Sequence, residues 1–113
     1  MNILILGSGI VGANLAKKLS EQGKNVFLLD DDASELKNLA ERFDIKTIYD
    51  DPLNPSFYKN FESEIDCFIA VTRSDEKNII TSKFAKEFLK VDKSIARVRN
   101  QNLILDENKS LLI

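Results

Sequence analysis

The glycine-rich turn at residues 7–12 (GSGIVG) constrains this chain more than any other feature. An apolar run at 3–6 precedes it, and a helical pattern, a second apolar run at 26–29 and Asp30 follow it. Strand, glycine turn, helix, strand and acid in this order are typical of a dinucleotide-binding unit. Asp30 comes 18 residues after Gly12, close to the roughly 20 expected for an acid that hydrogen-bonds a ribose.

Each glycine of the turn has a mechanical role in this interpretation. Gly7 permits the tight turn out of the strand, Gly9 lets a pyrophosphate approach the backbone, and Gly12 lets the helix pack closely on the strand. The helix that follows carries an apolar stripe that we expect to face the sheet: Val11, Leu15, Ala16 and Leu19. Its free N–H groups and its dipole favour an anion by roughly 0.3–1 kcal/mol per charge. The turn is therefore predicted to bind phosphates.

The length of 113 residues is enough for one domain with a modest core. The hydrophobic fraction of 43% and the charged fraction of 30% are ordinary for a soluble globular protein. The net charge is −2 and the basic residues are scattered, so no nucleic-acid partner is expected. No run approaches the roughly 18 apolar residues of a membrane span, and no signal peptide precedes the first strand. We expect a soluble, cytoplasmic protein.

Two residue types limit the chemistry that the chain can perform. The single cysteine, Cys67, excludes a disulfide framework within the chain, and its apolar surroundings favour a buried small hydrophobe over a reactive thiol. The chain contains no histidine, which is the commonest general acid or base and the commonest metal ligand. We therefore expect no metal site, no catalytic residues and no enzymatic activity.

The rest of the chain alternates helical and strand patterns. A helix is expected at about 33–43, with Asp32 as its cap and Glu35 as the partner in a capping box. Further strands are expected at 46–49, 67–71 and 94–98. This alternation predicts an α/β fold, namely a Rossmann-like doubly wound parallel sheet of order 3-2-1-4-5 in a three-layer sandwich.

Two more helices are expected on this sheet. The first is short and aromatic, with Phe57, Tyr58 and Phe61, for which core packing is a better explanation than cofactor stacking. The apolar face of the second consists of Ile79, Ile80, Phe84, Phe88 and Leu89. The strand before it ends at Thr72 and Arg73, and ligands of open parallel sheets bind beyond the carboxyl ends of the strands. Both residues should therefore lie at the edge of the same site as the glycine turn.

The end of the chain carries two apolar runs, 103–105 and 111–113, without a polar tail. Either the natural protein continues, with residues 1–113 as a single Rossmann-like domain at its N-terminus, or a partner buries this segment. An open sheet edge beside an apolar tail predicts self-association, most simply as a two-fold dimer.

Taken together, these motifs resemble the N-terminal nucleotide-binding domain of the RCK/KTN family, typified by TrkA-type regulators of bacterial potassium uptake. The resemblance covers roughly residues 1–103. It rests on four motifs: the glycine turn with Asp30, the Asp51 loop, the run 69–72 (IAVT) followed by Asp75, Glu76 and Asn78, and the run 95–98 (IARV). In the family such domains bind NAD(H) or ATP/ADP, dimerise, assemble into rings beneath a membrane channel subunit and gate it according to the ligand.

The resemblance implies a cytoplasmic regulatory subunit of a potassium uptake system, held at the inner face of the membrane through its channel partner. Its ligand would be NAD(H), with ATP or ADP as the alternative. Carried over, the glycines would hold the phosphates, Asp30 the adenosine ribose, Asp51 would lie near the adenine and Thr72 near the far half of the nucleotide. The full set of predicted cofactor-binding residues is Gly7, Ser8, Gly9, Ile10, Val11, Gly12, Asp30, Asp31, Asp51, Thr72, Arg73 and Arg97. The alternative for Asp51 and Thr72 is purely local hydrogen bonding, and for Arg97 a surface role.

Three positions depart from the family pattern. Asp50 stands where a glycine is usual, Asp31 where a basic residue is common, and Ile10 where a polar residue or an arginine is frequent. Because Ile10 offers no charge-assisted hydrogen bond to a terminal phosphate, this position weakens the case for a triphosphate ligand.

Two other functions compete with the regulatory one. The nucleotide-binding domain of an NAD-dependent oxidoreductase would need a substrate domain and a proton donor near the nicotinamide. Neither is visible, because histidine is missing and neither Tyr49 nor Tyr58 has a lysine four residues later. A methyltransferase that uses S-adenosylmethionine also combines a glycine turn with an acid, but it would want a longer chain with an acceptor pocket.

Overall fold

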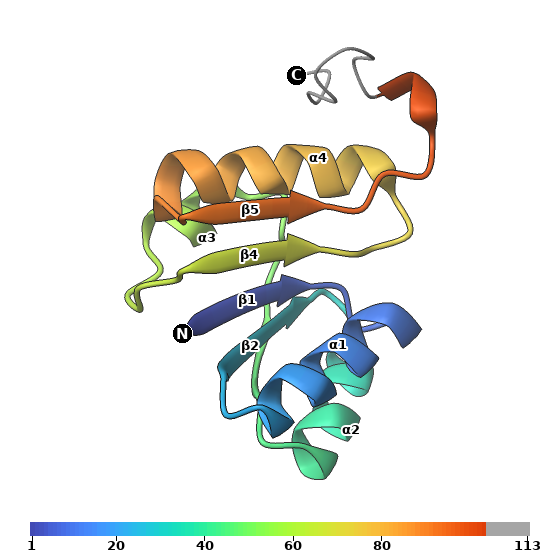
Figure 1. Cartoon of the computed structure of the whole chain (residues 1–113), viewed down its shortest axis with the longest axis vertical. Coiled ribbons are helices and arrows are strands. Elements are labelled where there is room, and N and C mark those ends of the chain that lie inside the picture. Colours follow the sequence, from blue (N-terminus) through green and yellow to red (C-terminus); the bar gives the residue numbers. More distant parts are fainter. Residues whose placement is uncertain (104–113) are drawn as a thin grey trace.

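A parallel sheet of five strands forms the middle of the protein in the computed structural model, which describes residues 1–103 (Figure 1). The strands are β1 (Asn2–Leu6), β2 (Asn25–Asp30), β3 (Lys46–Tyr49), β4 (Cys67–Ala70) and β5 (Lys93–Ala96). Their spatial order is β3-β2-β1-β4-β5, which confirms the predicted Rossmann-like order 3-2-1-4-5. The fifth strand begins one residue earlier and ends two residues earlier than predicted.

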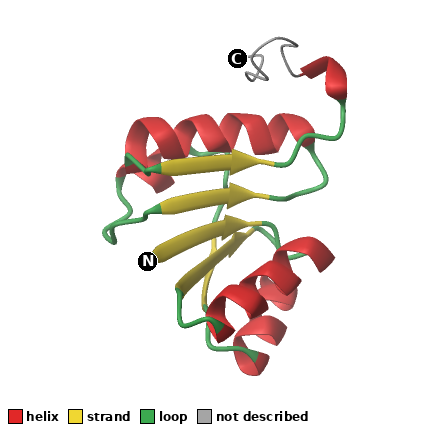
Figure 2. Ribbon diagram, viewed as in Figure 1, coloured by secondary structure: helices red, strands yellow, loops and turns green. Residues whose placement is uncertain are grey.

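The helices make the outer two layers of a three-layer sandwich. They are α1 (Ile10–Glu21), α2 (Ala33–Arg42), α3 (Pro55–Lys59) and α4 (Asp75–Phe84), which continues as the π-helical turn η1 (Ala85–Leu89), followed after β5 by the short 3₁₀ helix η2 (Gln101–Leu103). Helices α1 and α2 cover one face of the sheet, and α3 and α4 cover the other (Figure 2). The predicted layering is therefore confirmed.

Each face of the sheet carries its own apolar core, because successive residues of a strand point to opposite faces. The buried residues beneath α1 and α2 are Ile3, Ile5, Ala16, Val26, Leu28, Leu36, Leu39 and Cys67. Those beneath α3 and α4 are Leu4, Leu6, Phe27, Leu29, Tyr58, Ile65, Phe68, Ala70, Ala85 and Val91. Phe57 and Phe61 pack against the second core. The predictions that these aromatic residues and Cys67 are core residues are confirmed.

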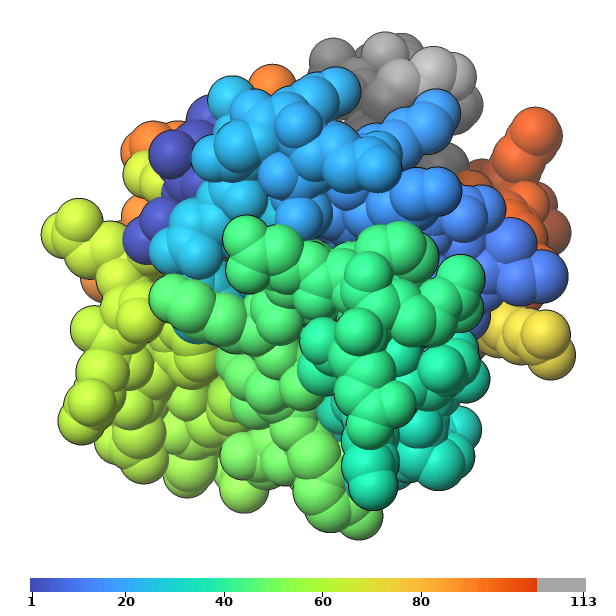
Figure 3. Space-filling model, turned by 90° about the horizontal axis from the view of Figure 1, so that it is seen from below, coloured from blue at the N-terminus to red at the C-terminus, as the bar shows by residue number. Residues whose placement is uncertain are grey.

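The strand register places the carboxyl ends of the three central strands at one level. Leu6 at the end of β1 pairs with Leu29 on β2 and with Ala70 on β4. The turns that leave these strands therefore meet at one edge of the sheet. The β3 edge of the sheet, where α2 lies beside β3, is on the side of the molecule that Figure 3 shows.

Three local predictions differ from the structure. Val11 is 45% exposed and does not belong to the inner face of α1, which consists of the buried Gly12 and Ala16 with Ala13, Leu15 and Leu19 packed beside them. Ile80 is 38% exposed and does not belong to the buried face of α4. Asp32 caps α2 as predicted. In the predicted capping box the Glu35 side chain would accept a hydrogen bond from the N–H of Asp32, but this N–H donates to Asp30 Oδ1. The predictions for residues 104–105 and 111–113 lie outside the described residues.

Candidate functional site

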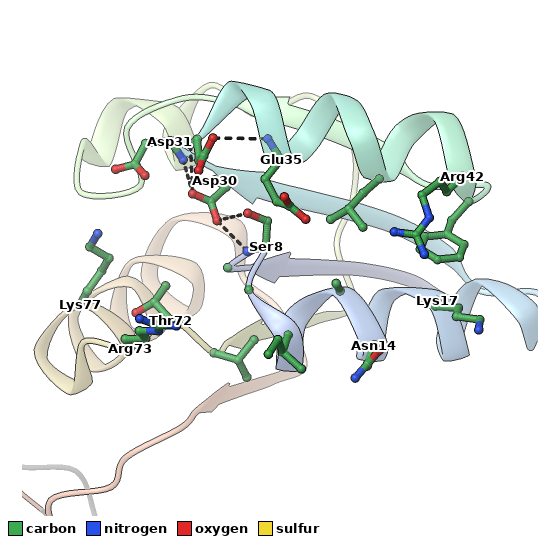
Figure 4. A pocket seen from close by; sticks show the side chains of 18 residues that line it. Ser8, Asn14, Lys17, Asp30, Asp31, Glu35, Arg42, Thr72, Arg73 and Lys77 are labelled. Atoms are coloured by element: carbon green, nitrogen blue, oxygen red, sulfur yellow. Dashed lines mark hydrogen bonds between the residues drawn. The ribbon is translucent and has the colours of Figure 1, made fainter.

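A cavity of about 700 Å³ lies at the carboxyl edge of the sheet, where the turns after β1, β2 and β4 meet (Figure 4). It is lined by Gly7, Ser8, Gly9, Ile10, Ala13, Asn14, Lys17, Asp30, Asp31, Asp32, Glu35, Leu39, Arg42, Phe43, Val71, Thr72, Arg73 and Lys77. The cavity therefore collects most of the residues that the sequence points to, and it continues along the groove between α1 and α2.

The glycine turn is built so that only glycine fits at two of its positions. Gly7 has a φ of +115°, and a Cβ there would lie 3.1 Å from the carbonyl carbon of Val71. A Cβ on Gly12 would overlap the carbonyl oxygen of Gly7, because α1 passes directly over the end of β1. A Cβ on Gly9 would meet nothing within 4 Å, so this backbone is open to the cavity. The roles predicted for Gly7 in the turn and for Gly12 in the packing of α1 fit this geometry, and the role of Gly9 in phosphate binding stays a prediction.

Helix α1 presents its amino end to the cavity. Gly9 is its N-cap, with no side-chain cap, and the first intrahelical hydrogen bond runs from the N–H of Ala13 to the Gly9 carbonyl at 2.8 Å. The N–H groups of the first turn lie at the positive end of the helix dipole, and no acidic residue stands in that turn. A phosphate is the kind of group that such a helix end binds.

Asp30 joins the turn after β2 to the glycine turn. Its Oδ2 accepts hydrogen bonds from the N–H and the hydroxyl of Ser8, both at 2.6 Å. Its Oδ1 accepts from the N–H groups of Asp31 at 2.7 Å and Asp32 at 3.1 Å. Burial raises the pKa of this carboxyl, but the hydrogen bonds from Ser8 and Asp31 outweigh it and hold the pKa below its ordinary value. Asp30 is therefore ionised at neutral pH.

The opposite wall of the cavity carries Thr72, Arg73 and Lys77, so an acidic turn faces a basic one (Figure 4). Asn78, which is fully buried, fixes this wall. Its Oδ1 accepts from the N–H of Thr72 at 2.9 Å and from the Thr72 hydroxyl at 2.7 Å, and its Nδ2 donates to the carbonyls of Thr72 at 3.0 Å and Arg97 at 2.9 Å. The Thr72 hydroxyl thus makes local hydrogen bonds while its residue lines the cavity.

Four residues predicted to bind the cofactor do not line the cavity. Val11 and Gly12 lie on α1 behind the turn, and Gly12 acts through packing. Asp51 lies in the loop after β3, where its Oδ1 accepts from the N–H of Leu53 at 3.0 Å. Arg97 follows β5, and its Nε is buried without a hydrogen-bond partner among the described residues. The structure brings together the other eight.

Sequence reasoning missed several polar residues of the cavity. Asn14 and Lys17 follow Ile10 by four and seven positions on α1, so a helical wheel begun at the glycine turn places them on one face. Lys77 lies in the first turn of α4, shortly after Arg73 and the N-cap Ser74, and lines the same wall of the cavity. Arg42 gives no such signal, because it reaches the cavity from the far end of α2.

The fold and the cavity define a Rossmann-like α/β domain whose glycine turn leaves backbone N–H groups open to an anion. This chain belongs to the TrkA-N domain family, whose model matches residues 3–107. It is 30% identical over 110 residues to the Trk system potassium uptake protein TrkA of Haemophilus influenzae, covering 96% of this chain and 24% of that protein. It is 37% identical over 100 residues to the protein of the same name from Halomonas elongata, covering 88% and 22%. The chain thus spans about a quarter of the length of these curated relatives.

Several solved structures have the same fold as this chain. The NAD(P)-binding domain of an exopolyphosphatase-related protein from Archaeoglobus fulgidus has a TM-score of 0.75 at 21% identity, covering 88% of this chain and 75% of that one. Saccharopine dehydrogenase from Saccharomyces cerevisiae has a TM-score of 0.71 at 22% identity, covering 88% and 22%. Among the described residues, none of the helices is both long and apolar enough to pass through a membrane.

Proposed function

We propose that this chain is a nucleotide-binding regulatory module of a potassium uptake system, with NAD(H) as its preferred ligand and ATP or ADP as the alternative. The observation that carries the proposal is the meeting of the glycine turn, the amino end of α1 and the ionised Asp30 in one cavity. Membership of the TrkA-N family, and relatives named as Trk system potassium uptake proteins, support the potassium role.

In this proposal the phosphates lie against the exposed backbone at Gly9 and the first N–H groups of α1. The adenosine ribose lies against Asp30, and the far half of the ligand reaches the wall that holds Thr72 and Arg73. Ile10 lines the cavity and is 80% exposed. Because this apolar side chain stands beside the phosphate position, a terminal phosphate gains no charge-assisted hydrogen bond there. A dinucleotide is therefore favoured over a triphosphate.

The module is proposed to bind its nucleotide without turning it over. The sequence offers no histidine to move a proton, and a switch needs only that the ligand bind two arrangements of the assembly with different affinity. A coupling of about 1–3 kcal/mol would change transport roughly 5- to 150-fold. The proposed partners are further copies of the chain, as a dimer or a ring, and a membrane potassium channel subunit at whose cytoplasmic face the assembly lies.

Binding is tested by calorimetry and thermal-shift measurements with NAD⁺, NADH, NADP⁺, ATP, ADP and S-adenosylmethionine. We expect NAD⁺ or NADH to raise the melting temperature most. Stabilisation by S-adenosylmethionine alone would contradict the proposal and favour a methyltransferase.

Regulation is tested by potassium flux in vesicles that contain the protein and its membrane subunit. Flux should change when NADH replaces NAD⁺ or when adenine nucleotide is added. If flux ignores every nucleotide while the purified protein oxidises NADH with a small substrate, the chain serves an oxidoreductase instead.

A further inference from the structure

The carboxylate of Asp30 is saturated by donors from its own chain. Ser8 supplies two donors to Oδ2, its N–H and its hydroxyl, and the N–H groups of Asp31 and Asp32 supply two to Oδ1. A carboxylate offers about four acceptor positions. A ribose hydroxyl that hydrogen-bonds Asp30 must therefore take the place of one of these four donors.

Only one of the four donors can leave without moving the backbone. The N–H groups of Asp31 and Asp32 belong to the turn that starts α2, where the Asp32 side chain accepts from the N–H of Glu35. The N–H of Ser8 follows Gly7, whose own N–H donates to the carbonyl of Leu29 at 3.0 Å. The Ser8 hydroxyl, in contrast, turns about a single side-chain bond. It is the exchangeable donor of the set, and its hydrogen bond to Asp30 is drawn in Figure 4.

We propose that the Ser8 hydroxyl competes with the 2′-hydroxyl of the nucleotide's ribose for Asp30 Oδ2. Ser8 would thereby set how much more tightly the site binds a ribonucleotide than the corresponding 2′-deoxyribonucleotide. This inference rests on the proposed function, because it takes a ribose-bearing nucleotide as the ligand. Both side chains line the cavity, and Ser8 is only 5% exposed. Water therefore screens their hydrogen bond little, and a hydrogen bond to an ionised carboxylate is stronger than one between neutral groups.

Removing the hydroxyl leaves the fold of the turn in place. Asp30 keeps three backbone donors in a Ser8→Ala variant, and Gly7 and Gly12 keep their contacts. The variant frees one acceptor position on Oδ2 for the ligand. Because the lost hydrogen bond also helps to lower the pKa of Asp30, the pKa of this carboxyl should rise in the variant, and a carbon-13 NMR titration reports that rise without any nucleotide.

The test is calorimetry of wild type, Ser8→Ala and Ser34→Ala with ADP and 2′-deoxyADP. Ser34→Ala is the matched control, since its hydroxyl also donates to a carboxylate, Asp32 Oδ1 at 2.9 Å, but Ser34 does not line the cavity. We expect Ser8→Ala to bind ADP about three- to tenfold more tightly than wild type. This gain is smaller than the full contribution of a hydrogen bond to a charged group. Affinity for 2′-deoxyADP should stay unchanged, and Ser34→Ala should match wild type with both ligands.

Several outcomes overturn the inference, and they separate it from the proposed function. Equal or weaker ADP binding by Ser8→Ala, while wild type still prefers ADP to 2′-deoxyADP, would show that the Ser8 hydroxyl supports Asp30 and does not compete with the ribose; the proposed function would stand. If Ser8→Ala melts early, Ser8→Gly removes the same hydroxyl and carries the same expectation. Wild type that binds neither ADP nor NADH would overturn the proposed function, and this inference with it.

Discussion

At the scale of single residues, Gly12 sets how closely α1 approaches β1. A Cβ at this position would overlap the Gly7 carbonyl oxygen, so Gly12→Val must push the helix off the strand at a cost of about 1–3 kcal/mol. We expect both the melting temperature and the nucleotide affinity to fall, because the same turn holds the core and the proposed phosphate site. Differential scanning fluorimetry and calorimetry measure the two effects.

Gly9→Ala is the matched control for this experiment. Gly9 has an extended backbone (φ −69°, ψ −169°), and a Cβ there meets nothing within 4 Å. Alanine therefore fits the fold, with a loss at the helix cap of at most about 1 kcal/mol, but it adds a methyl group to a residue that lines the cavity, beside the proposed phosphate position. Affinity should fall in Gly9→Ala with little change in melting temperature. If Gly12→Val loses stability and keeps full affinity, the phosphates bind elsewhere.

The carboxylates at 30–32 predict which dinucleotide the site selects. Asp30, Asp31 and Asp32 all line the cavity, and the lowered pKa of Asp30 keeps its charge at any pH above that value. A 2′-phosphate on the adenosine ribose would meet these like charges, and such contacts cost several kcal/mol. We expect NADH to bind at least about tenfold more tightly than NADPH. Lys77 and Arg73 stand on the facing wall, so equal affinity in calorimetry would mean that they compensate and that the prediction is wrong.

Much of the residue detail could be predicted because it follows from backbone geometry. The spacing of Gly7, Gly9 and Gly12 predicts the turn without knowledge of any contact. The saturation of Asp30 could not be predicted, because it depends on where a serine hydroxyl points in three dimensions. The role of Asn78 in supporting the cavity wall could not be predicted either, because its four hydrogen bonds involve residues as far apart in the sequence as Thr72 and Arg97.

At the scale of elements, Asp75 at the start of α4 holds the segment that follows β5. Its carboxylate accepts from the N–H groups of Arg99 at 3.1 Å and Asn100 at 2.8 Å. These two hydrogen bonds, together with the positive charges of Arg99 and Arg97, hold the pKa of Asp75 below its ordinary value of 3.8. The side chain of Arg99 donates in turn to the Arg73 carbonyl at 2.6 Å. The exit from the sheet is thus tied to the cavity wall.

A pH dependence follows for this contact. Because the pKa of Asp75 is lower in the folded chain than in the unfolded one, its contribution to stability is complete above about pH 3.8 and is lost as the pH falls through the lowered value. Amide exchange at Arg99 and Asn100, measured by NMR, should accelerate over that acid range. Asp75→Asn, whose amide keeps one acceptor oxygen and loses the other, should already show fast exchange at one of these two N–H groups at neutral pH.

Glu76→Gln is the control, since this neighbouring acid makes no hydrogen bond to the 97–100 segment among the described residues. Its exchange rates should match those of wild type. Unchanged exchange in Asp75→Asn would mean that the segment is held by the Arg99 side chain alone.

The ends and the buried faces of the helices could be predicted where their cause is local in the sequence, and not where it is a contact between distant residues. Asp32, with Glu35 three residues later, gives a local signal, and the cap of α2 falls where the sequence predicts. The inner face of α1 was mispredicted at Val11, because the close approach at Gly12 rotates the helix so that Gly12 and Ala16 face the sheet. The spacing of apolar residues identifies a helix and its apolar stripe. The closest contact with the sheet, here that of Gly12, decides which residues at the border of the stripe are buried.

At the scale of the whole molecule, one half of a sheet face carries no helix among the described residues. Helix α1 packs on β1 and β2, and α2 packs on β2 and β3. Ile95 on β5 pairs in register with Ile69, so it lies on the same face as these helices but beyond their reach. It is 43% exposed, and β5 is also the last strand of the described sheet. An apolar side chain on an open edge strand favours association with another chain.

We therefore expect the chain to self-associate through the β5 side of its sheet, most simply with two-fold symmetry. Sedimentation velocity across a concentration series should show a dimer that dissociates on dilution. Ile95→Lys places a charge on the open face and should shift the equilibrium to the monomer, because burying an unpaired charge is costly. Tyr49→Lys is the matched control, since Tyr49 is 68% exposed at the opposite edge strand, β3, and its replacement should leave the dimer intact. A clean monomer of wild type at high micromolar concentration would contradict the prediction, whereas dissociation by Tyr49→Lys alone would move the interface to the β3 edge.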